Sequence, residues 1–101
     1  MSRLSLDIHP EALAEARAAR QWYQSRSAGT ANAFLVEPDI GVESIRTAPE
    51  LYPNYLHGTR CYLLLRFPYL IVYRATPENV HVYAVAHSRR RPGYWKGRSA
   101  R

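Results

Sequence analysis

The chain has 101 residues, which is enough for one compact domain with a modest hydrophobic core but not for a second domain. Hydrophobic residues make up 47% of the sequence, yet none of the apolar runs approaches the roughly 20 residues that span a bilayer, so we expect no membrane partner. The formal net charge is +6, and the one cysteine excludes an internal disulfide or a cysteine cluster for a metal, which favours a reducing cytoplasm.

The first elements predicted are a strand and a helix. Apolar and polar residues alternate over residues 4–8, which is typical of a half-buried strand, whereas a signal peptide would need a continuous apolar stretch here. Pro10 suits the first position of a helix, where its missing N–H costs nothing. Apolar residues then recur at helical spacing and predict an inward face: Ala12, Ala16, Ala19 and Tyr23. Residues 27–29 end this helix.

A second helix is predicted in the rest of the first half. Thr30 is a suitable N-cap residue, and Phe34 and Ile45 are among the apolar positions that follow it. Pro38 and Gly41 interrupt this helical pattern. We therefore expect a kink or two short helices rather than one smooth, straight helix.

The second half predicts three strands. Residues 49–58 are rich in proline and tyrosine and indicate a loop, residues 60–66 indicate a strand, and the Phe-Pro pair at 67–68 indicates a turn. Two further strands are predicted over residues 69–74 and 80–87. Alternation in the last strand places four residues on one face: Val80, Val82, Ala84 and Ala86. The order β-α-α-β-β-β favours an α+β fold, with two helices packed on a small antiparallel sheet.

Charge is distributed unevenly along the chain. Residues 1–50 carry five arginines and seven acidic residues, a net charge of −2, whereas residues 51–101 carry nine basic residues and one acid, a net charge of +8. Thirteen of the 14 basic residues are arginine, whose planar fork suits phosphates and carboxylates. This asymmetry indicates a polyanionic target, an acidic protein partner, or both; the alternative is a solvated basic face.

The last 13 residues, which follow Ser88, combine six basic residues with Tyr94 and Trp95 and contain no acid. Cations bind phosphates and aromatic faces stack on unpaired bases, so this mixture is typical of nucleic-acid binding. A groove on a protein partner would use the same residue types. A third interpretation is a frayed, solubilising terminus, although adjacent large aromatic residues argue against it.

Three parts of the second half form one combination: Phe-Pro-Tyr-Leu-Ile-Val-Tyr at 67–73, Val-Tyr-Ala-Val-Ala-His at 82–87, and a final group made of Arg90, Pro92, Tyr94 and Trp95. This combination resembles the carboxy-terminal signature of RelE/ParE toxins of bacterial type II toxin–antitoxin systems, and the element order is similar over residues 3 to about 98. The resemblance implies a growth inhibitor that is wrapped and neutralised by a cognate antitoxin and needs no cofactor. Within the family, some toxins cut messenger RNA on the ribosome and others poison DNA gyrase.

The resemblance also bears on possible catalysis. A ribonuclease of this family carries cations on its central strands, with a basic residue and a tyrosine or histidine near the carboxy terminus, to activate the 2′-OH and stabilise the phosphate. The catalytic candidates here would be His87, Arg89, Arg90 and Tyr94. On the strands, where basic side chains are wanted, the sequence instead has Cys61, Leu63, Leu65 and Leu70. His87 has a further interpretation, since a histidine at a strand end commonly packs and bonds to the backbone.

Seven other residues are candidates for binding the target or the antitoxin: Arg60, Arg66, Tyr69, Tyr73, Arg74, Arg91 and Trp95. The three strand arginines would line an anion groove across the sheet, or form weak surface ion pairs with acids of the first half. The two strand tyrosines share a face and belong to the core or to an antitoxin groove. Cys61 is expected to be a small core residue, and the four histidines are too scattered to predict a metal site.

Three functions therefore compete. The first is a toxin that binds and inhibits a protein target such as DNA gyrase, the second is a ribosome-dependent endoribonuclease, and the third is a basic nucleic-acid-binding domain without toxicity. We favour the first, because the strand-borne half of a ribonuclease site is missing. An acidic antitoxin encoded beside this gene would exclude the third.

Overall fold

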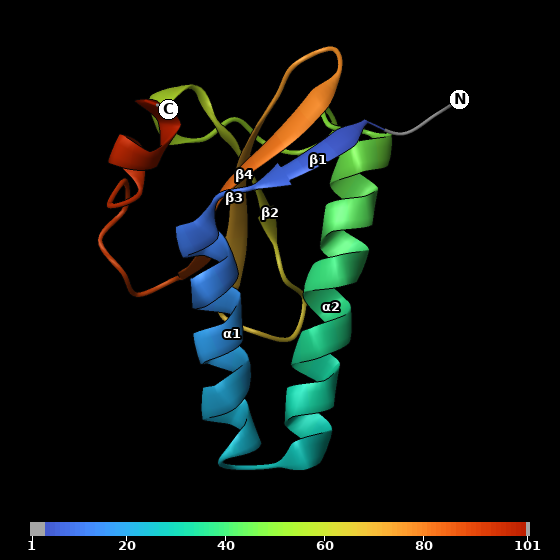
Figure 1. The fold of residues 1–101 in the computed structure, drawn as a ribbon, viewed down its shortest axis with the longest axis vertical. Helices are drawn as coiled ribbons and strands as arrows, with labels where there is room; N and C mark the ends of the chain where they lie inside the picture. Colours follow the sequence, from blue (N-terminus) through green and yellow to red (C-terminus); the bar gives the residue numbers. More distant parts are fainter. Residues whose placement is uncertain (1–3, 101) are drawn as a thin grey trace.

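The computed structural model of the protein describes residues 4–100, and it confirms the predicted α+β class and element order. The single domain predicted over residues 1–101 includes residues 1–3 and 101, which lie outside the described residues. The elements are β1 (Ser5–Ile8), α1 (Pro10–Gln24), α2 (Ala28–Thr47), β2 (Arg60–Leu63), β3 (Tyr69–Ala75), β4 (Asn79–His87) and a terminal 3-10 helix (Lys96–Ala100). The two helices lie side by side on one face of the sheet (Figure 1).

The sheet has the strand order β1-β4-β3-β2 and is mixed rather than antiparallel. The consecutive strands β2, β3 and β4 are antiparallel neighbours, as predicted, but β1 runs parallel to β4. The prediction of an entirely antiparallel sheet is therefore corrected for this one pair. The prediction failed here because alternating hydrophobicity indicates a strand but not its direction. The two helices connect β1 to β2 at the opposite edge of the sheet.

Helix α1 begins where the sequence predicts. Pro10 occupies its first turn, and the Nδ1 atom of His9 accepts a hydrogen bond from the backbone N–H of Glu11 at 3.0 Å, which caps the helix. Ala12 and Ala19 are buried on its inner face. Because these side chains are small, the helix axis lies close to the sheet and brings the next turn of α1 within reach of β4.

Helix α2 is one continuous helix of 20 residues, so the predicted alternative of two short helices separated at Pro38 and Gly41 is wrong. Burial of Phe34 and Ile45, on either side of Pro38, stabilises the helix by roughly 1.5–3 kcal/mol for each side chain, which offsets the ~3 kcal/mol cost of an interior proline. Gly41 faces the sheet, where an added Cβ would lie 2.7 Å from a ring carbon of Tyr62. This glycine therefore serves close packing and does not interrupt the helix.

The start of α2 and the end of β2 also differ from prediction. Ser27 rather than Thr30 is the N-cap, and its hydroxyl accepts a hydrogen bond from the Thr30 N–H at 3.3 Å. Strand β2 ends at Leu63 instead of extending to residue 66. The chain turns early because the backbone N–H of Arg66 donates to the Glu37 carboxylate of α2 at 3.1 Å instead of to a neighbouring strand.

A β-bulge divides β4 into two parts. Val72 pairs with Ala84 and Tyr73 pairs with Val82, so Tyr83 is one extra residue on β4. The extra residue reverses the alternation: Val80 and Val82 pack in the core under the helices, whereas Ala84 and Ala86 pack on the opposite face. The prediction that all four residues share one face is therefore wrong, because strict alternation does not survive a bulge.

The sheet consequently has a core on each face. The larger core lies under the helices and includes Phe34, Ile45, Ile71 and Tyr73. The smaller core lies on the opposite face and consists of Val72, Ala84, Ala86 and Trp95, with Trp95 only 1% exposed. The carboxy-terminal tail thus folds back across the sheet, beside the loop that leads into β2 (Figure 1).

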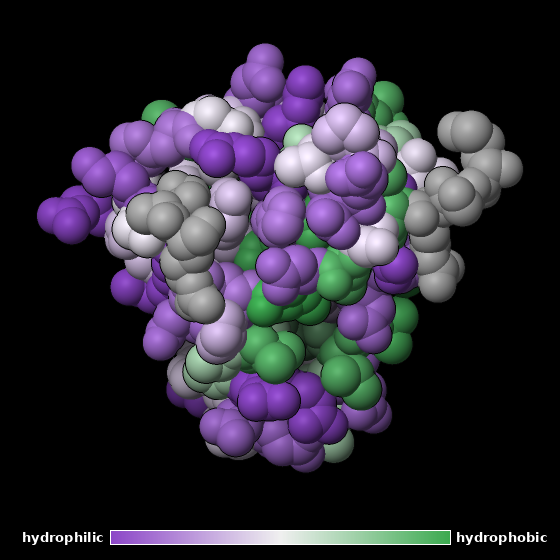
Figure 2. Space-filling view, turned by 45° about the horizontal axis from the view of Figure 1, so that its top comes forward, coloured by the Kyte–Doolittle hydropathy of each residue, from purple (hydrophilic) through white to green (hydrophobic). Residues whose placement is uncertain are grey.

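The helices expose apolar side chains on their outer surface. Hydrophobic residues gather over α1 and α2 in the space-filling view (Figure 2). The large hydrophobic side chains of the helices that are at least 40% exposed are Leu13, Trp22, Leu35, Val36 and Ile40. Within residues 4–100, none of the helices is long and apolar enough to cross a membrane. Exposed apolar surface of this kind commonly marks a site for a protein partner.

Replacing Trp95 with alanine tests the second core. We expect Trp95→Ala to lower the free energy of unfolding by roughly 3–5 kcal/mol, because it empties the centre of a packed cluster. Trp22→Ala is the matched control: Trp22 is 52% exposed, so its removal should cost about 1 kcal/mol or less. Denaturant titration of both variants measures the difference, and equal losses would contradict burial of Trp95.

Candidate functional site

The carboxylate of Glu15, in the second turn of α1, binds the carboxy-terminal tail. Arg98 donates to both of its oxygens, with Nη1 and Nη2 each at 3.0 Å, in the two-bond geometry that suits a guanidinium and a carboxylate. The Tyr94 hydroxyl donates to Oε2 at 2.7 Å, and Nη1 of Arg90 lies 3.4 Å from the same oxygen. The Glu15 side chain is 14% exposed, so these contacts are shielded from solvent.

The same contacts complete the edge of β4. Strand β1 pairs with β4 only as far as Val82, and beyond the bulge the backbone groups of β4 need other partners. Glu15 accepts a hydrogen bond from the Val85 N–H at 3.0 Å, and Arg98 donates to the Tyr83 carbonyl at 3.0 Å. One helix residue and one tail residue therefore take the place of the missing strand.

Tyr94, a catalytic candidate, is held as a neutral hydrogen-bond donor. Burial, followed by its hydrogen bond to Glu15 and the charge of that carboxylate, raises the pKa of the Tyr94 phenol well above its ordinary value. Arg90, a second candidate, stacks its guanidinium 3.6 Å from the centre of the Tyr94 ring. Both side chains are thus engaged with Glu15 or with each other.

The two remaining catalytic candidates lie at the end of β4. The Nδ1 atom of His87 accepts a hydrogen bond from the backbone N–H of Arg89 at 3.0 Å, and its ring packs edge-on against Tyr69 at 5.0 Å between centroids. These two contacts correspond to the second interpretation of His87, in which a histidine at a strand end packs and bonds to the backbone. The Arg89 side chain is exposed.

The opposite face of the sheet is apolar where a ribonuclease of the resembled family would carry cations. Leu63 of β2 lies opposite Leu70 of β3, which lies opposite Ala86 of β4. Leu63 is 65% exposed, and Leu65 in the following turn is 87% exposed. This row, Leu63, Leu70 and Ala86, is hereafter called the leucine face. Leu63 is the exposed end of this row and Ala86 is buried, and none of the three side chains carries a charge that could stabilise a phosphate.

A groove of about 630 Å³ lies between α1 and the adjoining ends of β3 and β4. Its walls are mostly apolar and include Ala19, Trp22, Tyr69 and Val85, while Arg90 stands at its rim. Trp22 is covered by the guanidinium of Arg26 at 3.7 Å from the ring centre. The groove thus combines an apolar floor with cations at its border.

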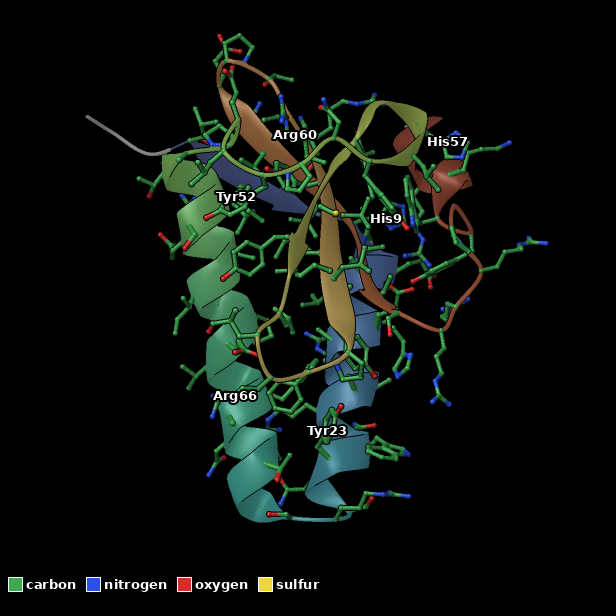
Figure 3. The ribbon with its side chains drawn as sticks, turned by 180° about the vertical axis from the view of Figure 1, so that it is seen from behind. His9, Tyr23, Tyr52, His57, Arg60 and Arg66 are labelled. Atoms are coloured by element: carbon green, nitrogen blue, oxygen red, sulfur yellow. The ribbon has the colours of Figure 1, made fainter. Side chains whose placement is uncertain are left out.

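The predicted binding arginines are separated in space. Arg66 pairs with Glu37 of α2 at 3.7 Å, whereas Arg60 and Arg74 line a polar pocket at the other end of β2. Arg60 begins β2, whereas Arg66 lies in the turn that follows the strand (Figure 3). Arg91 is exposed in the tail. The structure therefore does not bring the three strand arginines into one groove across the sheet.

The predicted aromatic candidates divide between core and groove. Tyr73 is fully buried, donates to the Pro49 carbonyl at 2.6 Å, and has a pKa raised to about 12 chiefly by burial. Trp95 is buried in the second core, whereas Tyr69 lines the groove beside α1.

Burial also raises the pKa of the Cys61 thiol, which opposes thiolate formation. Among residues 4–100, no cluster of three or more His, Cys, Asp or Glu side chains could hold a metal ion.

Glu15 and Arg98 are the central residues that the sequence did not identify. Glu15 is one of seven acids in the first half, and it lies 83 positions from Arg98. A weak local signal exists: Glu15 precedes Ala16 and Ala19 on a helix whose inward residues are small, so a charged side chain there can reach the sheet edge.

Comparisons with known proteins identify one family and one solved structure of similar fold. The model of the family described as "ParE toxin of type II toxin-antitoxin system, parDE" matches residues 6–92. A chain in the solved structure of a chromosomal ParDE toxin–antitoxin system from P. aeruginosa has a similar fold, with a TM-score of 0.73. The two chains are 17% identical, and the similarity covers 84% of this chain and 96% of the other. None of the curated proteins matches the sequence.

Neutralising Glu15 tests the role of its carboxylate. We expect Glu15→Gln to lower the free energy of unfolding by roughly 1.5–3 kcal/mol, the range for hydrogen bonds to a charged group. Asp39→Asn is the matched control, since Asp39 is an exposed carboxylate on α2. Thermal melts compare the two variants, and if Glu15→Gln melts like the control, the carboxylate does not hold the tail.

Proposed function

The chain belongs to the ParE toxin family of type II toxin–antitoxin systems, and we propose that it arrests bacterial growth by binding a protein target in the cytoplasm, with DNA gyrase as the family precedent. We further propose that a cognate antitoxin holds it inactive until the antitoxin is lost. Family membership supports the toxin role, and the side chains of this chain support the choice of a protein over an RNA as the target.

The leucine face is the observation that carries the proposal. Cleavage of RNA needs cations on the central strands to stabilise the charge that develops on the phosphate. Leu63 and Leu70 occupy those strands here, paired directly with each other. The exposed Leu63 gains free energy by burial against a protein, at roughly 25 cal/mol per Å² of apolar surface removed from water. The exposed Leu65 extends the same surface.

The catalytic candidates near the carboxy terminus support the same choice. A general acid or base must be free to reach the substrate and titrate near the working pH. Tyr94 instead donates to Glu15, and burial and that contact raise its pKa. His87 accepts from the backbone of Arg89, and Arg90 is shared between Glu15 and the Tyr94 ring. Tyr94 and Arg90 therefore hold the tail against α1, and His87 is engaged at the end of β4.

The antitoxin partner follows from charge and shape. The P. aeruginosa relative is part of a ParDE system, and we propose an antitoxin of the ParD type for this chain. The groove beside α1 would take apolar side chains of the antitoxin at Trp22 and Tyr69. Acidic antitoxin residues would neutralise part of the +8 half of the toxin, starting with Arg90 at the rim. Such burial predicts a negative heat-capacity change on binding.

Two reactions distinguish the targets. We expect the purified toxin to block supercoiling by DNA gyrase and to leave messenger RNA intact in a translating extract, because leucines occupy the strand positions where cleavage would need cations. Co-expression of the neighbouring antitoxin gene should restore growth and yield a stable complex. Cut messages together with normal supercoiling would contradict the proposal of a protein target.

A pair of variants tests the leucine face. Leu63→Asp places a charge at its exposed end and should abolish growth arrest, while Leu51→Asp, in the loop before β2, should retain it. The two leucines are 65% and 71% exposed, so both variants should keep their stability within about 1 kcal/mol. Melting curves verify the folds, and full toxicity of a folded Leu63→Asp variant would exclude this face as the docking surface.

A further inference from the structure

A polar pocket of about 580 Å³ lies at the end of the sheet where β2 begins and β3 ends. Three arginines line it, namely Arg46 of α2, Arg60 of β2 and Arg74 of β3, and of its described lining residues Glu50 alone is acidic. Figure 3 shows Arg60 at this end of the sheet. The pocket is distinct from the leucine face and from the groove beside α1.

Backbone carbonyls fix the positions of two of these guanidinium groups. Nη1 of Arg60 donates to the Tyr52 carbonyl at 2.6 Å and lies 3.4 Å from the Glu50 carbonyl. Nη2 and Nε of Arg74 donate to the carbonyls of His57 and Gly58 at 2.8 and 3.3 Å. Carbonyl oxygens orient a guanidinium without cancelling its charge, so both groups are positioned in advance for an anion.

The charges of Arg60 and Arg74 are not neutralised by an ion pair within residues 4–100. Arg60 contacts backbone carbonyls, and Arg74 contacts backbone carbonyls and the Tyr83 ring. By contrast, Arg46 pairs with Glu43 at 3.1 Å and Arg98 pairs with Glu15 at 3.0 Å. Nη2 of Arg60 and Nη1 of Arg74 make no hydrogen bond in this described part of the chain. Two donors and two positive charges are thus available at one pocket.

Gly58 permits this arrangement. Its φ of +75° suits glycine, and an added Cβ would lie 3.0 Å from Nη2 of Arg74. The neighbouring His57 also has a left-handed backbone, at φ 58°, which costs free energy for a residue with a side chain. The loop therefore adopts an uncommon conformation that turns two successive carbonyls toward Arg74.

We propose that this pocket binds the phosphate group of a small phosphorylated ligand of nucleotide size. A tetrahedral dianion accepts hydrogen bonds from several directions, and it can therefore contact guanidinium groups that approach from separate strands. A single carboxylate is planar and fits one fork. The volume is in the range of small-ligand sites and exceeds what a lone carboxyl group would fill. The site is independent of the proposed protein target.

Titration of the purified full-length toxin tests the proposal. The ligands are inorganic phosphate, a nucleoside monophosphate, and single-stranded oligonucleotides with a 5′-phosphate or a 5′-hydroxyl; a glutamate-rich peptide serves as the carboxylate probe. We expect phosphate to shift the amide resonances of Gly58 and Thr59, and the nucleotide to bind more tightly. Preference for the 5′-phosphorylated oligonucleotide would identify a nucleic-acid end as the source of the phosphate.

Variants show whether the pocket is responsible. Arg60→Gln and Arg74→Gln should each weaken phosphate binding by about ten- to a hundredfold, because each removes a charge-assisted contact. Arg60→Lys keeps the charge without the fork and should show an intermediate loss. Arg89→Gln is the matched control, since it removes one exposed charge outside the pocket and should bind as the unmodified chain does.

Several outcomes would overturn the proposal: phosphate ligands that cause no shift at Gly58 and Thr59, equal weakening in Arg89→Gln and Arg74→Gln, or binding of the glutamate-rich peptide in preference to phosphate. Melting curves verify the fold of each variant. If Arg60→Gln does not fold because its bond to Tyr52 is lost, the Arg74→Gln titration and the resonance shifts of the unmodified chain decide the question.

Discussion

The fold depends on how the backbone hydrogen bonds are satisfied at the edge of β4 that extends beyond β1. Strand β1 is only four residues long, and a bulge at Tyr83 turns a new set of backbone groups toward the edge. Leaving such groups buried without partners costs roughly 1–3 kcal/mol each. Glu15 accepts from the Val85 N–H and Arg98 donates to the Tyr83 carbonyl, while the two side chains bond to each other. The edge, helix α1 and the tail are thereby joined at one partly buried ion pair.

This ion pair organises the functional surface. Because Tyr94 and Arg98 are fixed to Glu15, Trp95 is held over Ala84 and Val72 on the second face of the sheet. The tail covers Ala84 and Ala86 on that face and leaves Leu63 exposed at its edge. A tail that carries conspicuous basic and aromatic residues is thus largely structural, although Arg89, Arg90, Arg91 and Lys96 are exposed on it. The surfaces proposed for the target, the antitoxin and the phosphate lie at three different places on the fold.

Local sequence patterns predicted the elements but not the contacts between distant segments. Pro10, the alternation before it and the Phe-Pro turn at 67–68 act through their own backbones, so the element order could be predicted. The path of α2 through Pro38 could not, because burial of Phe34 and Ile45 against distant strands decides it. The bulge at Tyr83 and the partners of Glu15 are likewise set by long-range pairing. In the candidate site, the leucines at the strand positions where a ribonuclease would carry cations were visible in the sequence, whereas the engagement of Tyr94 and Arg90 by Glu15 was not.

A double-mutant cycle between Glu15 and Arg98 tests this account most directly. The free energy of unfolding would be measured for the unmodified chain, Glu15→Gln, Arg98→Gln and the double variant. If the ion pair joins helix, edge and tail, the two substitutions should be coupled by about 1–3 kcal/mol. Losses that add within about 0.5 kcal/mol would contradict the account, since Glu15 and Arg98 would then stabilise the protein independently.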